Sequence, residues 1–221
     1  MMAIPTMLAA ILGAVAVVAA PVSRPAHAPL PAARGTPEPI GLVIAAEGTE
    51  ARYRVREQLA GLDFPNDAVG ITKGVRGIIV IDDEGRIIPE DSWFVVDLTT
   101  LKSDKERRDG YVQRRLLETE QYPTAELIPT EVRGLPWPLP TKGAMSFELV
   151  GDLTVHGVTN STTWQVNAEA VEGGFFGTAT TKFTFEDFGL EKPRVAVVLS
   201  VEDEIELDLQ FHLVPGSDPG R

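Results

Sequence analysis

Hydrophobic and polar residues alternate along most of the chain from Ala51 onward, which is the pattern of β-strands with one buried and one solvated face. The last strand shows it most clearly, because the odd positions from 205 to 213 are apolar and the even positions between them are polar. The first clear strand begins at Ala51. Further strands are predicted over residues 75–81, 93–98, 125–130, 145–155, 162–170 and 177–185.

One segment breaks this alternation and is predicted to be helical. Ser103 can cap a helix from Asp104 through Leu117, and the acidic Asp104 and Glu106 suit the positive end of the helix dipole. Gly110 weakens the segment, so we expect one or two short helices. About eight strands joined by turns, with so little helix, favour an all-β fold, an antiparallel barrel.

The interior of an eight-stranded barrel is either filled by side chains or holds one small ligand. The alternation of residues does not separate these two outcomes. Small residues at the expected inner positions favour a cavity but also suit tight corners of a barrel. They are Gly77, Ala168, Ala170, Gly177 and Ala179.

The N-terminal part differs from the rest. Its apolar run, Met7–Ala20, is typical of an export signal or an N-terminal membrane anchor, so an extracytoplasmic location is expected. Both alternatives stay open, because Pro21 and Pro29 directly follow the two candidate cleavage sites. The chain is accordingly divided into an export or anchor segment (1–28), a Pro-rich tether (29–45), the β-barrel domain (46–215) and a tail (216–221).

Composition excludes several classes of function. The chain has 221 residues, 32 acidic and 20 basic side chains and a net charge of −12, so it lacks the clustered positive charge that nucleic-acid binding requires. It has no cysteine, which excludes disulfides, thiolate metal sites and a cysteine nucleophile. Only three histidines are present, and they form no multi-histidine metal motif, so we expect neither a metal nor a cofactor.

The residues resemble those of a known family, the YceI-like proteins. The strongest element is Gly151–Thr159, GDLTVHGVT, which reads as a strand running into a glycine-containing turn, with His156 in the turn. Three other elements add to the resemblance: the charged block Leu101–Asp109 with the Tyr-Pro step in Gln121–Pro123, the Asp-Phe-Gly turn Asp187–Gly189, and the final strand from Val201 to Leu207.

The resemblance implies a lipocalin-like barrel, outside the cytoplasm, that binds a polyisoprenoid or another amphiphile with a long apolar tail, such as a quinone. Two departures from the usual family pattern remove basic charge. Asn160 stands where Lys or Arg is common, and Phe185-Glu186 replaces a common Arg-Ser. A binding site for an anionic headgroup is therefore in question.

An apolar tail needs only a dry tunnel, so the candidate lining residues are the large side chains at expected inner positions. For each of them core packing is the alternative to ligand contact. They are Tyr53, Val55, Trp93, Val95, Phe147, Leu149, Trp164, Val166, Phe183 and Phe188.

Three polar residues are candidates for the mouth of the barrel or for a headgroup site. Arg107 and Arg108 suit phosphate geometry, with a salt-bridged helix face as the alternative. His156 could bind a headgroup, with a residue that only shapes the turn as the alternative.

Three functions compete on this evidence. A lipid-carrying binding protein is favoured over an envelope structural or interaction domain with a filled core. An enzyme is disfavoured, because no set of nucleophile, base and orienting residue can be assembled. The sequence leaves the oligomeric state open, with a homodimer as one option.

Overall fold

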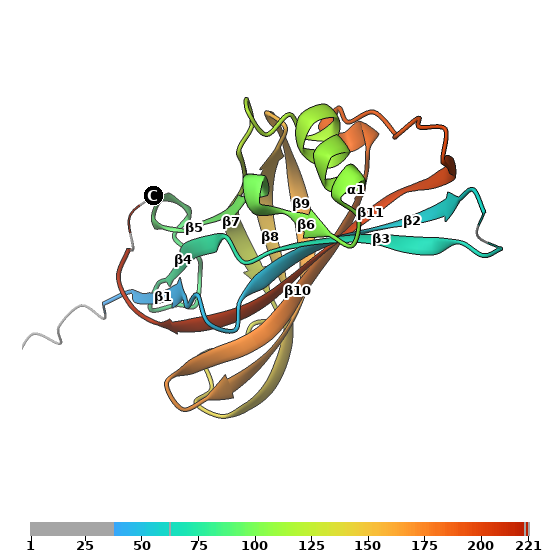
Figure 1. Ribbon diagram of the computed structural model, residues 1–221. Coiled ribbons are helices and arrows are strands. Elements are labelled where there is room, and N and C mark those ends of the chain that lie inside the picture. Colours follow the sequence, from blue (N-terminus) through green and yellow to red (C-terminus); the bar gives the residue numbers. More distant parts are fainter. Residues whose placement is uncertain (1–37, 62, 219, 221) are drawn as a thin grey trace, which may run out of the picture. The chain divides into compact units, whose positions relative to one another are not determined.

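The computed structural model describes residues 38–61, 63–218 and 220 (Figure 1). The chain divides into Met1–Gly35 and Thr36–Arg221, and only the second unit contains described residues. The export or anchor segment expected over residues 1–28, and the first part of the tether, therefore lie outside the described residues.

The described residues are mostly β-strands. In chain order they form β1 (Ile40–Ile44), β2 (Glu50–Leu59), β3 (Asn66–Thr72), β4 (Val75–Ile81), η1 (Pro89–Asp91), β5 (Trp93–Asp97), η2 (Leu98–Thr100), β6 (Lys102–Ser103), α1 (Glu106–Tyr111), the π-helical turn η3 (Val112–Leu116), β7 (Thr124–Arg133), β8 (Gly143–Val155), β9 (Val158–Val171), β10 (Gly174–Thr184), η4 (Glu186–Phe188) and β11 (Val198–Pro215).

These elements make a closed antiparallel barrel that is best understood as eight long strands within the described residues (Figure 1). The first three long strands are each broken in two, as β1 with β2, β3 with β4, and β5 with β6. The halves pair accordingly, β2 with β3 and β1 with β4, then β4 with β5 and β3 with β6. Pairing of β1 with the end of β11 closes the ring, which confirms the predicted fold class.

Threonine hydroxyls satisfy the backbone where the long strands break. Thr49 is 3% exposed; its Oγ1 donates to a backbone carbonyl four residues earlier (2.7 Å) and accepts from the backbone N–H of His212 (3.1 Å). Oγ1 of Thr72 lies 2.5 Å from Oγ1 of Thr100 and accepts from the N–H of Gly74 (2.9 Å). The bends can therefore remain buried without orphaned polar groups.

Two hydrophobic clusters lie on opposite faces of β4 and β5. The main core fills the barrel interior and includes Ile79 and Phe94, whereas a small separate cluster holds Ile78, Trp93 and Val95. Because side chains alternate between faces along a strand, neighbouring residues of one strand fall into different clusters. The residues of β4 and β5 in the main core therefore face the barrel interior, whereas those in the small cluster do not.

The structure corrects three expectations about element boundaries. The tether was expected to reach residue 45, but residues 40–44 form β1 and pair with two strands. The strand after the GDLTVHGVT turn begins at Val158 rather than Thr162. The residue before α1 is Lys105 rather than Ser103, because the Ser103 hydroxyl instead accepts from the Lys105 N–H (3.2 Å) and hydrogen-bonds the Asp109 carboxylate (2.6 Å).

Gly151, within β8, faces a bulge on the neighbouring strand β7. The register of β7 against β8 shifts between Pro129 and Glu131, and Pro129 lies opposite Gly151. A Cβ at Gly151 would come within 2.7 Å of the carbonyl oxygen of Ile128. Glycine is therefore required by the close approach of the two backbones.

Candidate ligand-binding site

The barrel encloses an inner cavity of about 150 Å³. Its walls come from strands all around the barrel and from the α1–η3 segment. Among its lining residues, only Arg52, Tyr53, Thr72 and Asp208 are polar. The apolar lining residues include Val75, Phe94, Val96, Leu98, Leu101, Leu117, Ala125, Leu127, Leu153, Val155, Trp164, Phe183, Leu190, Ile205, Leu207 and Leu209. A cavity of this size and chemistry stays dry and accepts small apolar molecules.

An outer chamber of about 450 Å³ adjoins the inner cavity. It lies between β2, β3, α1 and the segment 193–201, and its lining includes Glu57, Lys105, Arg107 and Arg108 beside apolar residues. Five residues line both spaces and so form the partition between them: Tyr53, Val55, Val112, Leu116 and Phe185. Because this partition consists of side chains, rotamer changes there can join the two spaces.

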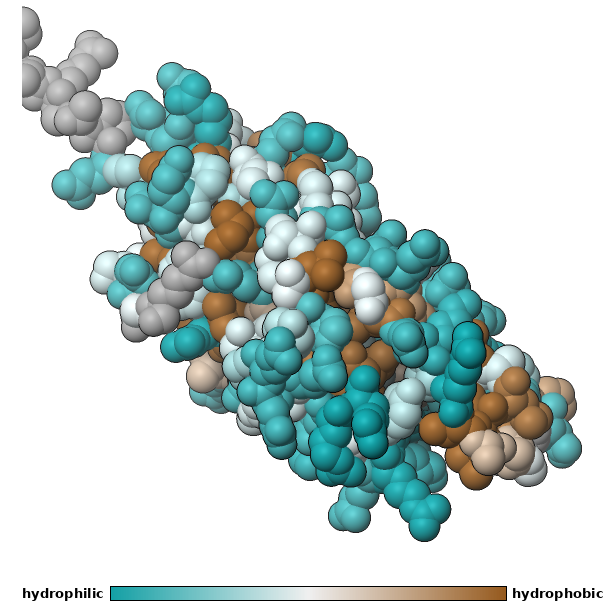
Figure 2. Space-filling model, turned by 90° about the horizontal axis from the view of Figure 1, so that it is seen from above, coloured by the Kyte–Doolittle hydropathy of each residue, from teal (hydrophilic) through white to brown (hydrophobic). Residues whose placement is uncertain are grey.

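The lip of the outer chamber is unusually apolar for a surface. Val197 lines the chamber and is 62% exposed, while nearby Leu199 is 66% exposed. Phe64, between β2 and β3, is 79% exposed. Figure 2 shows apolar surface at the right-hand end, where β2 and β3 end in Figure 1. Exposed apolar side chains thus lie at the edge of the chamber, together with the exposed cations Lys105 and Arg107.

The structure places the ten expected lining residues in three different positions. Tyr53, Val55, Trp164 and Phe183 line the inner cavity, and the first two also line the outer chamber. Four others belong to or pack against the main core without lining either space, and they serve as packing: Phe147, Leu149, Val166 and Phe188.

Trp93 and Val95 do not line the inner cavity, contrary to expectation. They lie in the small cluster on the opposite face of β5, whereas Phe94 and Val96 line the inner cavity. The strand is apolar on both faces, so its sequence carries no signal of which face points inward. The cavity residues Phe94 and Val96 were missed for this reason.

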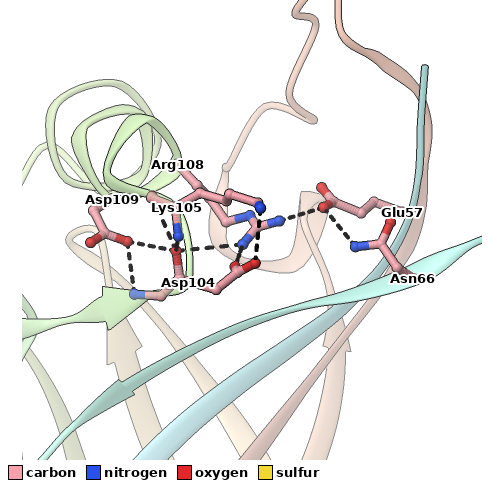
Figure 3. A network of polar contacts seen from close by, with 7 residues as sticks. Glu57, Asn66, Asp104, Lys105, Arg108 and Asp109 are labelled. Atoms are coloured by element: carbon pink, nitrogen blue, oxygen red, sulfur yellow. Dashed lines mark hydrogen bonds and ion pairs between the residues drawn. The ribbon is translucent and has the colours of Figure 1, made fainter. Parts of the chain in front are cut away.

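Arg108 lies in the wall of the outer chamber within a network of polar groups (Figure 3). Its side chain is 13% exposed, and its Nη2 donates to Oε1 of Glu57 at 2.6 Å. A second ion pair joins it to Asp104, and the same Glu57 oxygen also accepts from the side-chain amide of Asn66 (3.2 Å). Burial alone would lower the pKa of Arg108, but the bonds to Glu57 and Asp104 raise it, so this guanidinium stays charged and paired.

Arg107 and Arg108 therefore differ sharply in their surroundings. Arg107 lines the outer chamber from an exposed position and has no hydrogen-bond or ion-pair partner among the described residues. Arg108 matches the alternative interpretation, a salt-bridged helix face, although one of its partners is a β2 residue 51 positions away.

Tyr53 lines both spaces, and its hydroxyl stays neutral over a wide pH range. Burial raises the pKa of its phenol to about 12, and the nearby Arg108 opposes that effect only in part. Its ring lies over Gly70 of β3, where a Cβ would meet the ring at 2.1 Å. The glycine therefore leaves the space that the Tyr53 ring occupies.

His156 lies outside both spaces and shapes a turn. His156 and Gly157 form the two-residue loop between β8 and β9, and their φ angles of 51° and 76° match a type I′ hairpin turn. The imidazole Nε2 lies 2.9 Å from Oε2 of Glu118, and its ring packs edge-on against Tyr122. Its position agrees with the alternative, structural interpretation of His156.

The Asp-Phe-Gly turn is also structural. Phe188 is fully buried, and the Asp187 carboxylate accepts hydrogen bonds from the N–H (2.6 Å) and hydroxyl (2.8 Å) of Thr184. These bonds hold the pKa of Asp187 below its usual value. The side-chain amide of Asn160 donates to the Asp187 carbonyl, so the residue after HGVT pins this turn.

A family model for the YceI-like domain matches residues 43–213. This chain belongs to the YceI-like family. Two of the segments that carried the resemblance, GDLTVHGVT and the Asp-Phe-Gly turn, lie at corners of the barrel and contact each other through Val158 and Gly189.

Three solved structures show the same fold at low sequence identity. A polyisoprenoid-binding domain from Saccharophagus degradans, implicated in plant cell wall breakdown, superposes with a TM-score of 0.62 at 14% identity, covering 81% of this chain and all of that one. BcnA from Burkholderia cenocepacia gives 0.55 at 14% identity, covering 77% and 98%. The Campylobacter jejuni YceI protein gives 0.52 at 15% identity, covering 73% and 91%.

Curated relatives match over a shorter stretch. UPF0312 proteins of Pseudomonas putida are 33% identical over 116 residues, which is 48% of this chain and 56% of theirs. The alignment thus spans about half the length of these relatives.

The part of the chain that the structure describes shows neither a metal cluster nor a spanning helix. No group of three or more His, Asp or Glu side chains there could hold a metal ion. No helix there is both long and apolar enough to cross a bilayer.

Proposed function

We propose that this YceI-like domain is an extracytoplasmic binding or carrier protein that holds a polyisoprenoid or a similar long-tailed amphiphile, such as a quinone, inside its barrel. The observation that carries the proposal is the apolar inner cavity and its continuation into the outer chamber. The fold shared with a polyisoprenoid-binding domain supports it. The apolar segment within residues 1–28 supports the location.

The free energy of tail burial is large enough for this function. Burying one five-carbon isoprene unit contributes roughly 4 kcal/mol at about 0.8 kcal/mol per carbon. Three units contribute roughly 12 kcal/mol, comparable with the association cost of roughly 4–15 kcal/mol. A tail of that length exceeds the inner cavity, so we expect it to occupy both spaces once Phe185 or Leu116 in the partition changes rotamer.

The decisive experiment extracts the purified full-length protein with organic solvent and identifies co-purifying lipids by mass spectrometry. We expect an isoprenoid or quinone in the extract, and reloading of the stripped protein with geranylgeraniol. A stripped protein that takes up no apolar probe would instead favour the alternative, an envelope domain with a filled core.

A variant that fills the inner cavity sharpens this test. Ala125 lines the inner cavity, so Ala125→Phe places a ring where the tail would lie and should weaken geranylgeraniol binding by roughly 100-fold, about 2.8 kcal/mol. Ala144→Phe makes the same change at an exposed position of β8 and should bind as the wild type does. Equal affinities of the two variants would place the tail elsewhere.

A further inference from the structure

The outer chamber carries a feature that bears on the headgroup of the ligand, an inference that rests on the proposed function. Its wall holds one carboxylate, Glu57, and one guanidinium, Arg108, both largely shielded from water, at 9% and 13% side-chain exposure. The remaining cations that line the chamber, Lys105 and Arg107, are exposed. The wall of the chamber therefore carries a shielded ion pair, whereas its rim, formed by Lys105 and Arg107, carries exposed positive charge.

The positive charge of Arg108 is already neutralised. Nη2 of Arg108 donates to the Glu57 carboxylate at 2.6 Å, and Nη1 of Arg108 pairs with Asp104. An anionic headgroup would have to displace Glu57 from Arg108, or lie beside it and face an uncompensated like charge. Both are costly where water is scarce.

The same wall offers sites for an uncharged, hydrogen-bonding head. Oε1 of Glu57 accepts hydrogen bonds from Arg108 and Asn66, whereas Oε2 accepts none from the described residues. The Tyr53 hydroxyl, which lines the same chamber, has no hydrogen-bond partner there either. Because the pKa of Tyr53 is raised to about 12, this hydroxyl stays a donor at physiological pH. The chamber thus offers an acceptor at Glu57 and a donor at Tyr53, and a hydroxyl head can bond to either, because it has one O–H donor and two acceptor lone pairs.

We propose that Glu57 determines headgroup specificity by holding Arg108 neutralised, so that the outer chamber selects an uncharged, hydroxyl-bearing head over a phosphorylated one. Arg108 is then a positioning residue for Glu57 and not a phosphate clamp. The exposed Lys105 and Arg107 remain solvated, and their attraction for anions is screened by salt.

The test compares two probes with the same tail, geranylgeraniol and geranylgeranyl monophosphate, on the stripped full-length protein at physiological salt. We expect the wild type to bind the alcohol at least roughly tenfold more tightly, about 1.4 kcal/mol. Glu57→Gln releases Arg108 from its charged partner and should strengthen phosphate binding roughly tenfold, with little change for the alcohol.

Glu106→Gln is the matched control, because it removes the same charge from an exposed α1 residue that lines neither space. It should leave the ratio of the two affinities as in the wild type. Thermal unfolding of each variant verifies folding, and the wild-type comparison stands by itself if Glu57→Gln does not fold.

The outcomes separate this inference from the proposed function. A wild type that binds the phosphate as tightly as the alcohol, or more tightly, overturns the headgroup inference while the carrier function stands. The same affinity ratio in folded Glu57→Gln as in the wild type overturns the role of Glu57. A wild type that binds neither probe overturns the carrier function and this inference with it.

Discussion

The inner cavity and the outer chamber share five wall residues but differ in chemistry. The inner cavity is lined almost wholly by apolar side chains, whereas the outer chamber places a buried ion pair beside apolar walls. The first can supply affinity for any apolar tail, because the hydrophobic effect has no direction. The second can supply selectivity, because an unmatched polar or charged group is penalised there. Under the proposed function, affinity and selectivity thus belong to two adjoining spaces.

The largest effect should come from breaking the ion pair in the outer wall. Arg108→Met leaves Glu57 buried without its charged partner, so the free energy of unfolding should fall by about 3 kcal/mol. Arg107→Met changes an exposed neighbour and should cost no more than about 0.5 kcal/mol. Urea unfolding of both variants measures the difference; equal losses would show that the pair is not a special part of the wall.

An intermediate effect should come from Tyr53, which lines both spaces. The pKa of Tyr53 is about 12 in the folded protein, above the ordinary value of 10. The neutral phenol therefore contributes fully to the free energy of unfolding below pH 10, and this contribution is lost as the pH rises toward 12. The wild type should therefore lose about 1 kcal/mol more than Tyr53→Phe between pH 9 and pH 11. Parallel pH dependences of unfolding in the two proteins would show that the phenol is not buried as described.

The smallest effect should come from His156→Gly, because His156 lines neither space. His156→Gly keeps a residue that accepts a φ of 51°, so stability should stay within about 0.5 kcal/mol and geranylgeraniol affinity should not change. His156→Val, a β-branched residue in the same turn, should cost roughly 1–2 kcal/mol. Isothermal calorimetry and urea unfolding test both; a clear loss of affinity in His156→Gly would move the site toward this corner.

The sequence predicted the barrel because alternation is a local property that the fold preserves. It identified most strands of the barrel, and in β11 the alternating residues Ile205, Leu207 and Leu209 line the inner cavity. It missed β1, a five-residue strand next to a Pro-rich stretch, and it also missed β3. It chose the wrong face of β5, where Trp93 and Phe94 are both apolar.

The sequence did not predict the outer chamber, because the contact between Glu57 and Arg108 in its wall joins residues 51 positions apart. Arg108 was identified as a candidate, but nothing in the helix indicated Glu57 as its partner from β2. The departure at Phe185 was noted only as a loss of basic charge. In the structure that residue is 2% exposed and forms part of the partition between the two spaces.

The closing contact of the barrel has a consequence for how the chain acquires its structure. Residues 42–44 of β1 pair with residues 213–215 of β11, so the first and last strands must meet before the ring is complete. Contacts of such long sequence separation form slowly. During synthesis the chain therefore exposes an open sheet edge until residues 213–215 are free to pair. Truncation of the chain before residue 213 would leave that edge without its partner and open to aggregation.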